Sequence, residues 1–257
     1  MGLSEPALSL TDLALGIVVI ALAVLLQRTP GVHRYWRLTF WWVGAAALAG
    51  AVHHGVVTYS DTWAGPSWAI ISFMVVVAVS YLLAASVVEV LGPGRGRIFW
   101  VLRSLGLIAY AALAIAGYAG VNAILACEGI TMIAILALWG RALRDHNPLA
   151  VPVIIAILAS GAAAAVRALP SAVTDLVGLD PTSLYHLAQI PGMVLLYHAL
   201  VAVPQRQPRA TPAPAQEESV GTARPQGRLS PPSGEFGYRA GAGVARGWRC
   251  GTATRAW

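Results

Sequence analysis

The sequence predicts an all-α integral membrane protein, a polytopic bundle of seven transmembrane helices. Of its 257 residues, 57% are hydrophobic and only 11% are charged, and the mean hydropathy is +0.67. Soluble domains carry about 25% charged residues. The apolar residues form repeated runs near the length of about 20 residues that a helix needs to cross a bilayer. These runs are continuously apolar rather than alternating, which argues against a transmembrane β-barrel.

The first four spans follow from apolar runs that end at turn-forming residues. Each backbone N–H and C=O inside such a run must be hydrogen-bonded within the segment, so a helix is expected. Proline and glycine mark the connections, with TPG at 29–31, GP at 65–66 and GPG at 92–94. In chain order, the expected spans are 10–26, 38–57, 67–91 and 98–118.

The last three spans are expected at 122–143, 149–169 and 181–203. Asp180 suits the N-cap of the final helix and Pro181 suits its first position. The connection before the fifth span is very short, and the sixth span is rich in alanine with Arg167 close to its end. Six spans therefore remain the alternative.

Arginines gather on alternate connections, which orients the bundle. One side carries Arg28, Arg34, Arg37, Arg95, Arg97, Arg103, Arg141 and Arg144, and the other side carries Arg167 alone. The positive-inside rule then places the N-terminus outside and the C-terminus in the cytoplasm. Seven spans require opposite ends, so the charge pattern and the helix count agree.

Residues 204–257 are predicted to be a disordered cytoplasmic tail following a transmembrane domain at 1–203. The tail is rich in Arg, Pro and Gly, and its eight arginines against three glutamates account for +5 of the net charge of +6. Such a segment cannot bury enough apolar surface to fold. The tail either binds anionic lipid or is an extension without a role. The basic balance thus does not predict a nucleic-acid partner, and the expected surroundings are membrane lipids.

Ionisable side chains inside the spans are candidate functional groups, because burying them in a bilayer is costly. Asp12, the pair His53 and His54, Glu128 and His186 all fall on the outer side of the predicted topology. Together they predict a metal- or proton-binding site in the outer leaflet. Asp12 has a second interpretation as the N-cap of the first helix.

His186 is the leading single candidate, as a metal ligand or a proton-transfer group. Pro191 lacks an N–H, which frees the carbonyl of Leu187 and opens a polar segment beside His186. Gln189 lies one turn further on the same face and is expected to orient the histidine ring from the second shell of the site. The alternative is a histidine hydrogen-bonded to Glu128 or Asp12 across the bundle.

At these residues the chain resembles an uncharacterised bacterial family of seven-span membrane proteins. The resemblance rests on three motifs and covers roughly residues 5–203: EP at 5–6 with TD at 11–12, HHG at 53–55, and LYH at 184–186 with Gln189. It implies a multi-pass protein of the bacterial plasma membrane. More remotely, the arrangement is similar to the alkaline-ceramidase and adiponectin-receptor superfamily of seven-span hydrolases.

That remote similarity implies zinc held by histidines of the second and last helices, here His53 or His54 and His186. Position 190 is Ile where the superfamily has a second histidine, so Glu128 or Asp12 would complete the site. The implied activity is metal-dependent hydrolysis of a lipid amide or ester, with Glu128 and Asp12 as the catalytic carboxylates. The alternative is a transporter, a receptor or an accessory structural membrane protein without catalytic activity.

Overall fold

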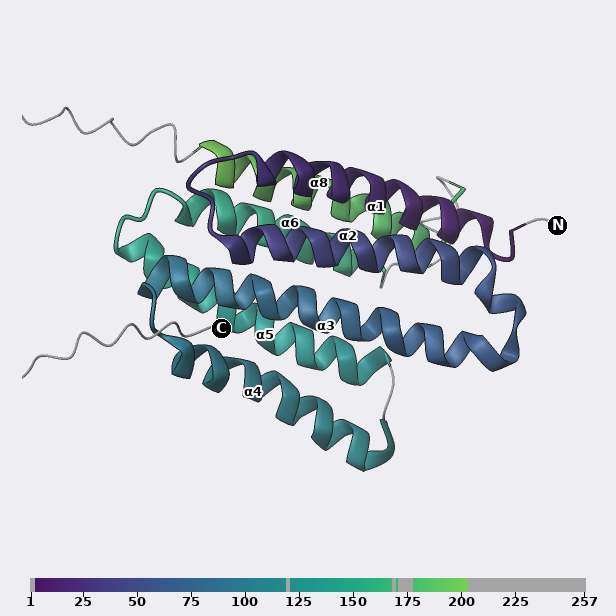
Figure 1. Cartoon of the computed structure of the whole chain (residues 1–257). Coiled ribbons are helices and arrows are strands. Elements are labelled where there is room, and N and C mark those ends of the chain that lie inside the picture. Colours follow the sequence, from purple (N-terminus) through teal and green to yellow (C-terminus); the bar gives the residue numbers. More distant parts are fainter. Residues whose placement is uncertain (1–2, 119–120, 168–169, 171–177, 203–257) are drawn as a thin grey trace, which may run out of the picture. The chain divides into compact units, whose positions relative to one another are not determined.

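The computed structural model of the chain describes residues 3–118, 121–167, 170 and 178–202. All of them belong to the first of two units into which the chain divides, Met1–Arg209. Within these residues the fold is all-α (Figure 1). The seven α-helices described are α1 (Pro6–Gln27), α2 (Arg34–Gly55), α3 (Asp61–Leu91), α4 (Gly96–Leu113), α5 (Val121–Arg144), α6 (Ala150–Val166) and α8 (Pro181–Ala202). The predicted tail, 204–257, lies outside the described residues.

Six of these helices are long and apolar enough, by length and composition, to cross a membrane. They are α1, α2, α3, α4, α5 and α8, whereas α6 is a shorter apolar helix of 17 residues. The chain is therefore a helical, multi-pass membrane protein. The prediction of an all-α bundle is confirmed for the described residues, and the choice between six and seven spans stays a prediction.

Several helices begin earlier than their apolar runs, and α1 and α3 are the two that have a proline near the start. α1 begins at Pro6, whose fixed φ suits the first helical position, so Asp12 lies in the second turn. The interpretation of Asp12 as the N-cap is therefore wrong, and Glu5 occupies that place. α3 begins at Asp61 and runs through Pro66, which removes one backbone donor near the start of a helix of 31 residues.

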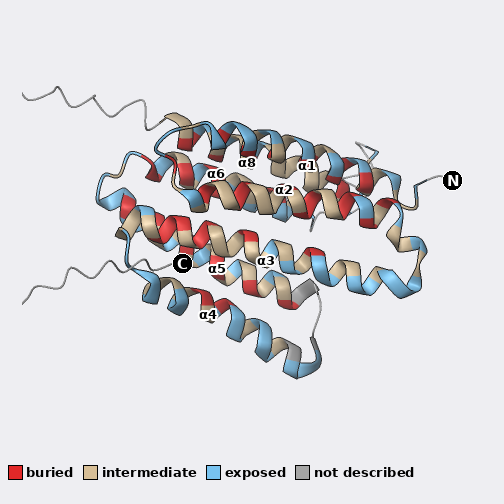
Figure 2. Ribbon diagram, viewed as in Figure 1, coloured by how far each residue is buried: buried red, intermediate tan, exposed pale blue. Residues whose placement is uncertain are grey.

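The helices pack in a chain of neighbours. α1 packs on α2 and α8, α2 on α3, α3 on α5, α5 on α6, and α6 on α8, while α4 packs mainly on α5. Buried residues follow the facing sides of the helices, and most of α4 is exposed (Figure 2). Trp36 and Trp139 are the largest fully buried side chains, and Trp139 Nε1 donates to Ser86 Oγ over 3.0 Å.

The two ends of the bundle differ in charge. The start of α1, the end of α2 and the starts of α3, α5 and α8 share one end, here called the N-terminal end (Figure 1). The opposite, arginine-rich end carries Arg28, Arg34, Arg37, Arg95, Arg97, Arg141 and Arg144. This segregation fixes where the candidate functional groups lie relative to the positive charge.

Candidate functional site

Three helices bring four ionisable side chains together at the N-terminal end. Asp12 comes from α1, His54 from α2 and His186 from α8, and Glu5 immediately precedes α1. We call these four residues the Asp12 cluster. The Glu5 side chain is 43% exposed. The side chains of His54, His186 and Asp12 are 15%, 13% and 8% exposed, respectively. The cluster therefore leads from the surface into the bundle.

His54 lies between two carboxylates. Its Nδ1 is 2.5 Å from Glu5 Oε2, and its Nε2 is 4.0 Å from Asp12 Oδ2. When Nδ1–H donates to an ionised Glu5, the Nε2 of a neutral ring carries a lone pair that faces Asp12. A proton added to His54 therefore gives a cation that attracts the Asp12 carboxylate. A proton on Asp12 gives an acid that can donate to the Nε2 lone pair of His54. The gap needs to close by about 1 Å to become a hydrogen bond.

His186 faces the other oxygen of Asp12. Its Nδ1 lies 3.1 Å from Asp12 Oδ1, within ion-pair range. The same Nδ1 is buried and makes no hydrogen bond, because the two groups are close but not aligned. A small rotation of the carboxylate or the ring would align them. Asp12 is thus flanked by one histidine at each carboxylate oxygen.

Glycines of α2 make room for the polar side chains of α1. A Cβ at Gly50 would lie 2.5 Å from Asp12 Oδ2, and a Cβ at Gly55 would lie 2.8 Å from Ser9 Oγ. Ser9 Oγ donates to the carbonyl of Ala51 over 2.8 Å. Any larger residue at position 50 would therefore displace the Asp12 carboxylate.

Backbone contacts hold Glu5 beside His54. The N–H of Ser4 donates to the carbonyl of Gly55 over 3.1 Å, and the N–H of Glu5 donates to the carbonyl of His54 over 3.0 Å. The segment before α1 is thereby tied to the C-terminal turn of α2, where the last carbonyls have no partner within the helix. This pairing positions the exposed carboxylate at the entrance of the cluster.

The start of α8 is fixed by Asp180, as the sequence predicts. Its Oδ1 accepts from the N–H of Thr182 over 2.9 Å and of Ser183 over 3.0 Å, and its Oδ2 accepts from the Ser183 hydroxyl. Partial burial favours the neutral acid, but these hydrogen bonds outweigh it and hold the pKa of Asp180 below its ordinary value. The cap sets the position of His186, six residues further along.

His53 and Gln189 have partners outside the Asp12 cluster. His53 Nδ1 is hydrogen-bonded with Ser67 Oγ of α3 at 2.5 Å, and its ring centroid lies 5.7 Å from that of Trp68. Gln189 Nε2 donates to the hydroxyl of Tyr185 over 2.5 Å, one turn back on the same helix. The two adjacent histidines thus face different neighbours, and Gln189 does not bond the ring of His186.

Glu128 lies apart from the Asp12 cluster and forms an ion pair with Arg103. Arg103 Nη2 is 3.1 Å from Glu128 Oε1, and Arg103 Nη1 is 3.4 Å from Oε2. Both side chains are largely buried, at 3% and 12% exposure. α5 packs on α3, α4 and α6, so it does not carry Glu128 to Asp12 on α1. The sequence-based interpretation placed Arg103 just inside the start of the fourth span, on the cytoplasmic side, and overlooked this pair.

A signal for the pair exists in the sequence. Arg103 and Glu128 both stand inside apolar runs, where a charge without a partner of opposite sign is costly. Gly106 adds to it, because a Cβ there would lie 2.6 Å from the carbonyl oxygen of Cys127. Such close approach lets α4 and α5 bring the two charges into contact.

The cluster does not have the arrangement of the zinc site that the remote resemblance implies. Among the described residues, no group of three or more His, Cys, Asp or Glu side chains is placed to hold a metal ion. His54 directs Nδ1 to Glu5 rather than toward His186, and Glu128 is ion-paired with Arg103. His54, His186 and Asp12 are not arranged as a ready metal site, and zinc binding by them stays a prediction.

Comparison with known proteins identifies a family of unknown function. The model of DUF6962, described as a family of unknown function, matches residues 7–205. The match includes Asp12, His54 and His186, and Glu5 precedes it. No curated protein and no solved structure matches the chain.

Proposed function

The chain belongs to this family of unknown function, and we propose that it is a proton-binding membrane protein whose Asp12 cluster takes up and releases protons at the N-terminal end. The observation that carries the proposal is the position of His54, with a carboxylate facing each of its ring nitrogens. Imidazole can accept a proton at one nitrogen and release one from the other, and its ordinary pKa lies near physiological pH.

The four groups form a path for one proton. Glu5 is the exposed acceptor, His54 passes the proton inward, and Asp12 lies between His54 and the half-buried His186. A proton that reaches His54 creates a cation 4.0 Å from Asp12 Oδ2, and the attraction closes that gap. Protonation therefore pulls α1 toward α2 at this end of the bundle, which makes the cluster a pH-responsive contact.

The charge distribution supports an outward-facing site. The Asp12 cluster lies at the end of the bundle opposite the seven arginines of the arginine-rich end. By the positive-inside rule that end faces the cytoplasm, so the cluster senses protons outside the cell. Seven spans with an external N-terminus complete this topology.

Histidine NMR titration tests the proposal on the full chain in detergent micelles. The ring carbons of histidine are labelled, and the signals of His54 and His186 are assigned by substitution. We expect both signals to titrate in shared steps, because interacting groups show pKa values that belong to the pair. Asp12→Asn keeps the shape and removes the charge, so the two histidines should then titrate independently.

His198→Gln is the matched control, because His198 lies on the same helix and is exposed. It should leave the shared steps unchanged. Independent single-step titration of both histidines in the wild-type protein would contradict the proposal. Stoichiometric zinc in the same sample, lost in His186→Ala, would replace it with the metal-dependent hydrolase.

A further inference from the structure

A cavity of about 320 Å³ opens between α3, α4 and α5, and Trp68 in its lining has its ring centroid 6.4 Å from that of His54. α4 packs mainly on α5 and only lightly on α3, and it diverges from α3 toward the N-terminal end (Figure 1). The cavity is lined by Gly65, Trp68, Ala69, Ser72, Phe73, Val76, Tyr110 and Ile124. This volume is in the range of small-molecule sites.

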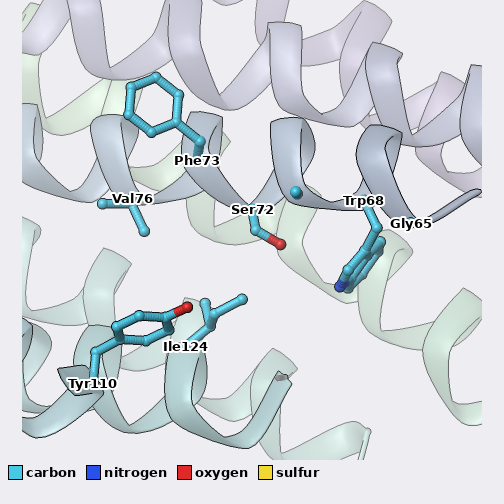
Figure 3. Close-up of a pocket in the computed structure, with 8 residues that line it drawn as sticks. Gly65, Trp68, Ser72, Phe73, Val76, Tyr110 and Ile124 are labelled. Atoms are coloured by element: carbon cyan, nitrogen blue, oxygen red, sulfur yellow. The ribbon is translucent and has the colours of Figure 1, made fainter. Parts of the chain in front are cut away.

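Three hydrogen-bonding groups are directed into this space without partners. The hydroxyls of Ser72 and Tyr110 point into the gap between the helices, with Trp68 beside them (Figure 3). Within the described ranges, none of the three side chains makes a hydrogen bond. Other serines in these helices bond a carbonyl one turn back, as Ser80 does to Val76 over 2.6 Å. The groups at the cavity are therefore free to donate to a ligand.

The charges near the cavity are already satisfied. Arg103 reaches its inner end, where Nη2 donates to the carbonyl of Val76 over 3.3 Å and to Glu128 Oε1 over 3.1 Å. Its Nη1 donates to Thr131 Oγ1 over 2.8 Å and contacts Glu128 Oε2 at 3.4 Å. Both terminal nitrogens of the guanidinium have partners and Glu128 balances its charge, so Arg103 offers no unpaired positive charge to a phosphate or a carboxylate. The eight lining residues include no Arg, Asp, Glu or His.

We propose that this cavity binds a neutral glycerolipid, with an acyl chain against the apolar wall and a hydroxyl or ester oxygen at Ser72 and Tyr110. Phe73, Val76 and Ile124 supply the apolar wall. The absence of a free cation among the lining residues selects against an anionic head group, since burying an unpaired charge is costly.

Photolabelling tests the proposal with the full chain in phosphatidylcholine vesicles. The probe is a diacylglycerol with a photoactivatable group in one acyl chain, and the labelled residues are mapped by peptide mass spectrometry. We expect labelling to concentrate on the lining residues of α3 and α4 and to be reduced by unlabelled diacylglycerol. A phosphatidylcholine that carries the same acyl chain should label these residues several-fold less.

Two kinds of variant distinguish the contribution of the cavity's free space to lipid binding from the contribution of its hydrogen-bond donors. Gly65→Leu fills the cavity from a position where an added Cβ meets no atom within 4 Å, and Ala69→Phe fills it one turn further on. The double variant Ser72→Ala with Tyr110→Phe removes two donors and should reduce labelling about 25-fold, since each hydrogen bond contributes roughly a factor of five. Ser104→Ala is the control, because that hydroxyl already bonds Trp100 on its own helix.

The outcomes are distinct. Loss of labelling in both kinds of variant, with none in Ser104→Ala, supports a glycerolipid site. Equal labelling by the two lipid probes, unchanged in the variants, would show bulk lipid in the cavity and overturn the proposal. Stronger competition by a fatty acid than by diacylglycerol would overturn the choice of a neutral ligand. Elution of each variant at the wild-type volume on size exclusion confirms that it is folded.

Discussion

The ion pair between Arg103 and Glu128 predicts an unequal response to the removal of either partner. Glu128→Gln keeps the shape of the side chain but leaves a buried guanidinium, 3% exposed, without a counter-charge. Arg cannot lose its proton in a protein. Arg103→Met leaves a carboxyl group instead, and that group can neutralise itself by taking up a proton. The glutamine variant should therefore be the less stable of the two.

The magnitude follows from the burial and the contacts of the pair. Breaking one side of a buried ion pair costs about 3–5 kcal/mol, and Arg103 also bonds Thr131 and the carbonyl of Val76. We expect Glu128→Gln to lose about 4 kcal/mol and Arg103→Met about 3 kcal/mol. The double variant Arg103→Met with Glu128→Gln removes both charges and should lie within about 2 kcal/mol of the wild type.

Reversible unfolding in mixed micelles of increasing denaturing detergent, followed by tryptophan fluorescence, measures these free energies. Arg141→Met is the matched control, because Arg141 pairs with Asp145 at 3.6 Å but both side chains are more than 60% exposed. That change should cost no more than about 0.5 kcal/mol. Additive effects of the two buried substitutions would refute the reasoning, since residues in one ion pair must couple.

Three further predictions concern packing, capping and topology. Gly50→Ala places a methyl group against the carboxylate of Asp12 and should lower the free energy of unfolding by about 1–3 kcal/mol in the same assay. Gly129→Ala is the control and should not destabilise the protein, because an added Cβ there meets no atom within 4 Å. Asp180→Ala removes the cap of α8 and should cost about 1 kcal/mol of the free energy of unfolding. Because the pKa of Asp180 is lowered in the folded state, the stability that the cap contributes is present above about pH 4. It is lost as the pH falls through the folded-state pKa. In a background without other cysteines, Thr62→Cys should react with an impermeant thiol reagent from outside the cell and Asp145→Cys only after lysis; the reverse pattern would refute the proposed orientation.

Much of the fold could be predicted from the sequence because bilayer thickness and backbone hydrogen bonding restrict an apolar run to one structure. The predicted last helix at 181–203 matches α8 at Pro181–Ala202, and its cap is the one expected. The start of α1 was displaced by four residues, since the polar residues before Leu10 made the first turn resemble a connection. Local composition does not reveal that Pro6 already begins the helix.

The candidate site could be predicted only in part. Topology placed Asp12, His54 and His186 at one end, and the structure brings these three together. Topology could not show that Glu128, at the same end, lies on a helix that packs away from α1. The depth of a residue in the membrane follows from its position along the chain, but the position along the chain does not reveal which helices are neighbours. Glu5 was also overlooked as a site residue, since its place beside His54 depends on backbone contacts between the chain before α1 and the end of α2.

Infrared difference spectroscopy of the reconstituted protein between neutral and acidic pH tests the proton-binding account most directly. If the Asp12 cluster takes up protons, acidification should produce a protonated-carboxyl band that is lost in Asp12→Asn and displaced in His54→Gln, because both groups share the proton. Glu128→Gln should leave this band in place. A spectrum without a carboxyl band sensitive to Asp12→Asn, in a protein that still folds, would contradict the account.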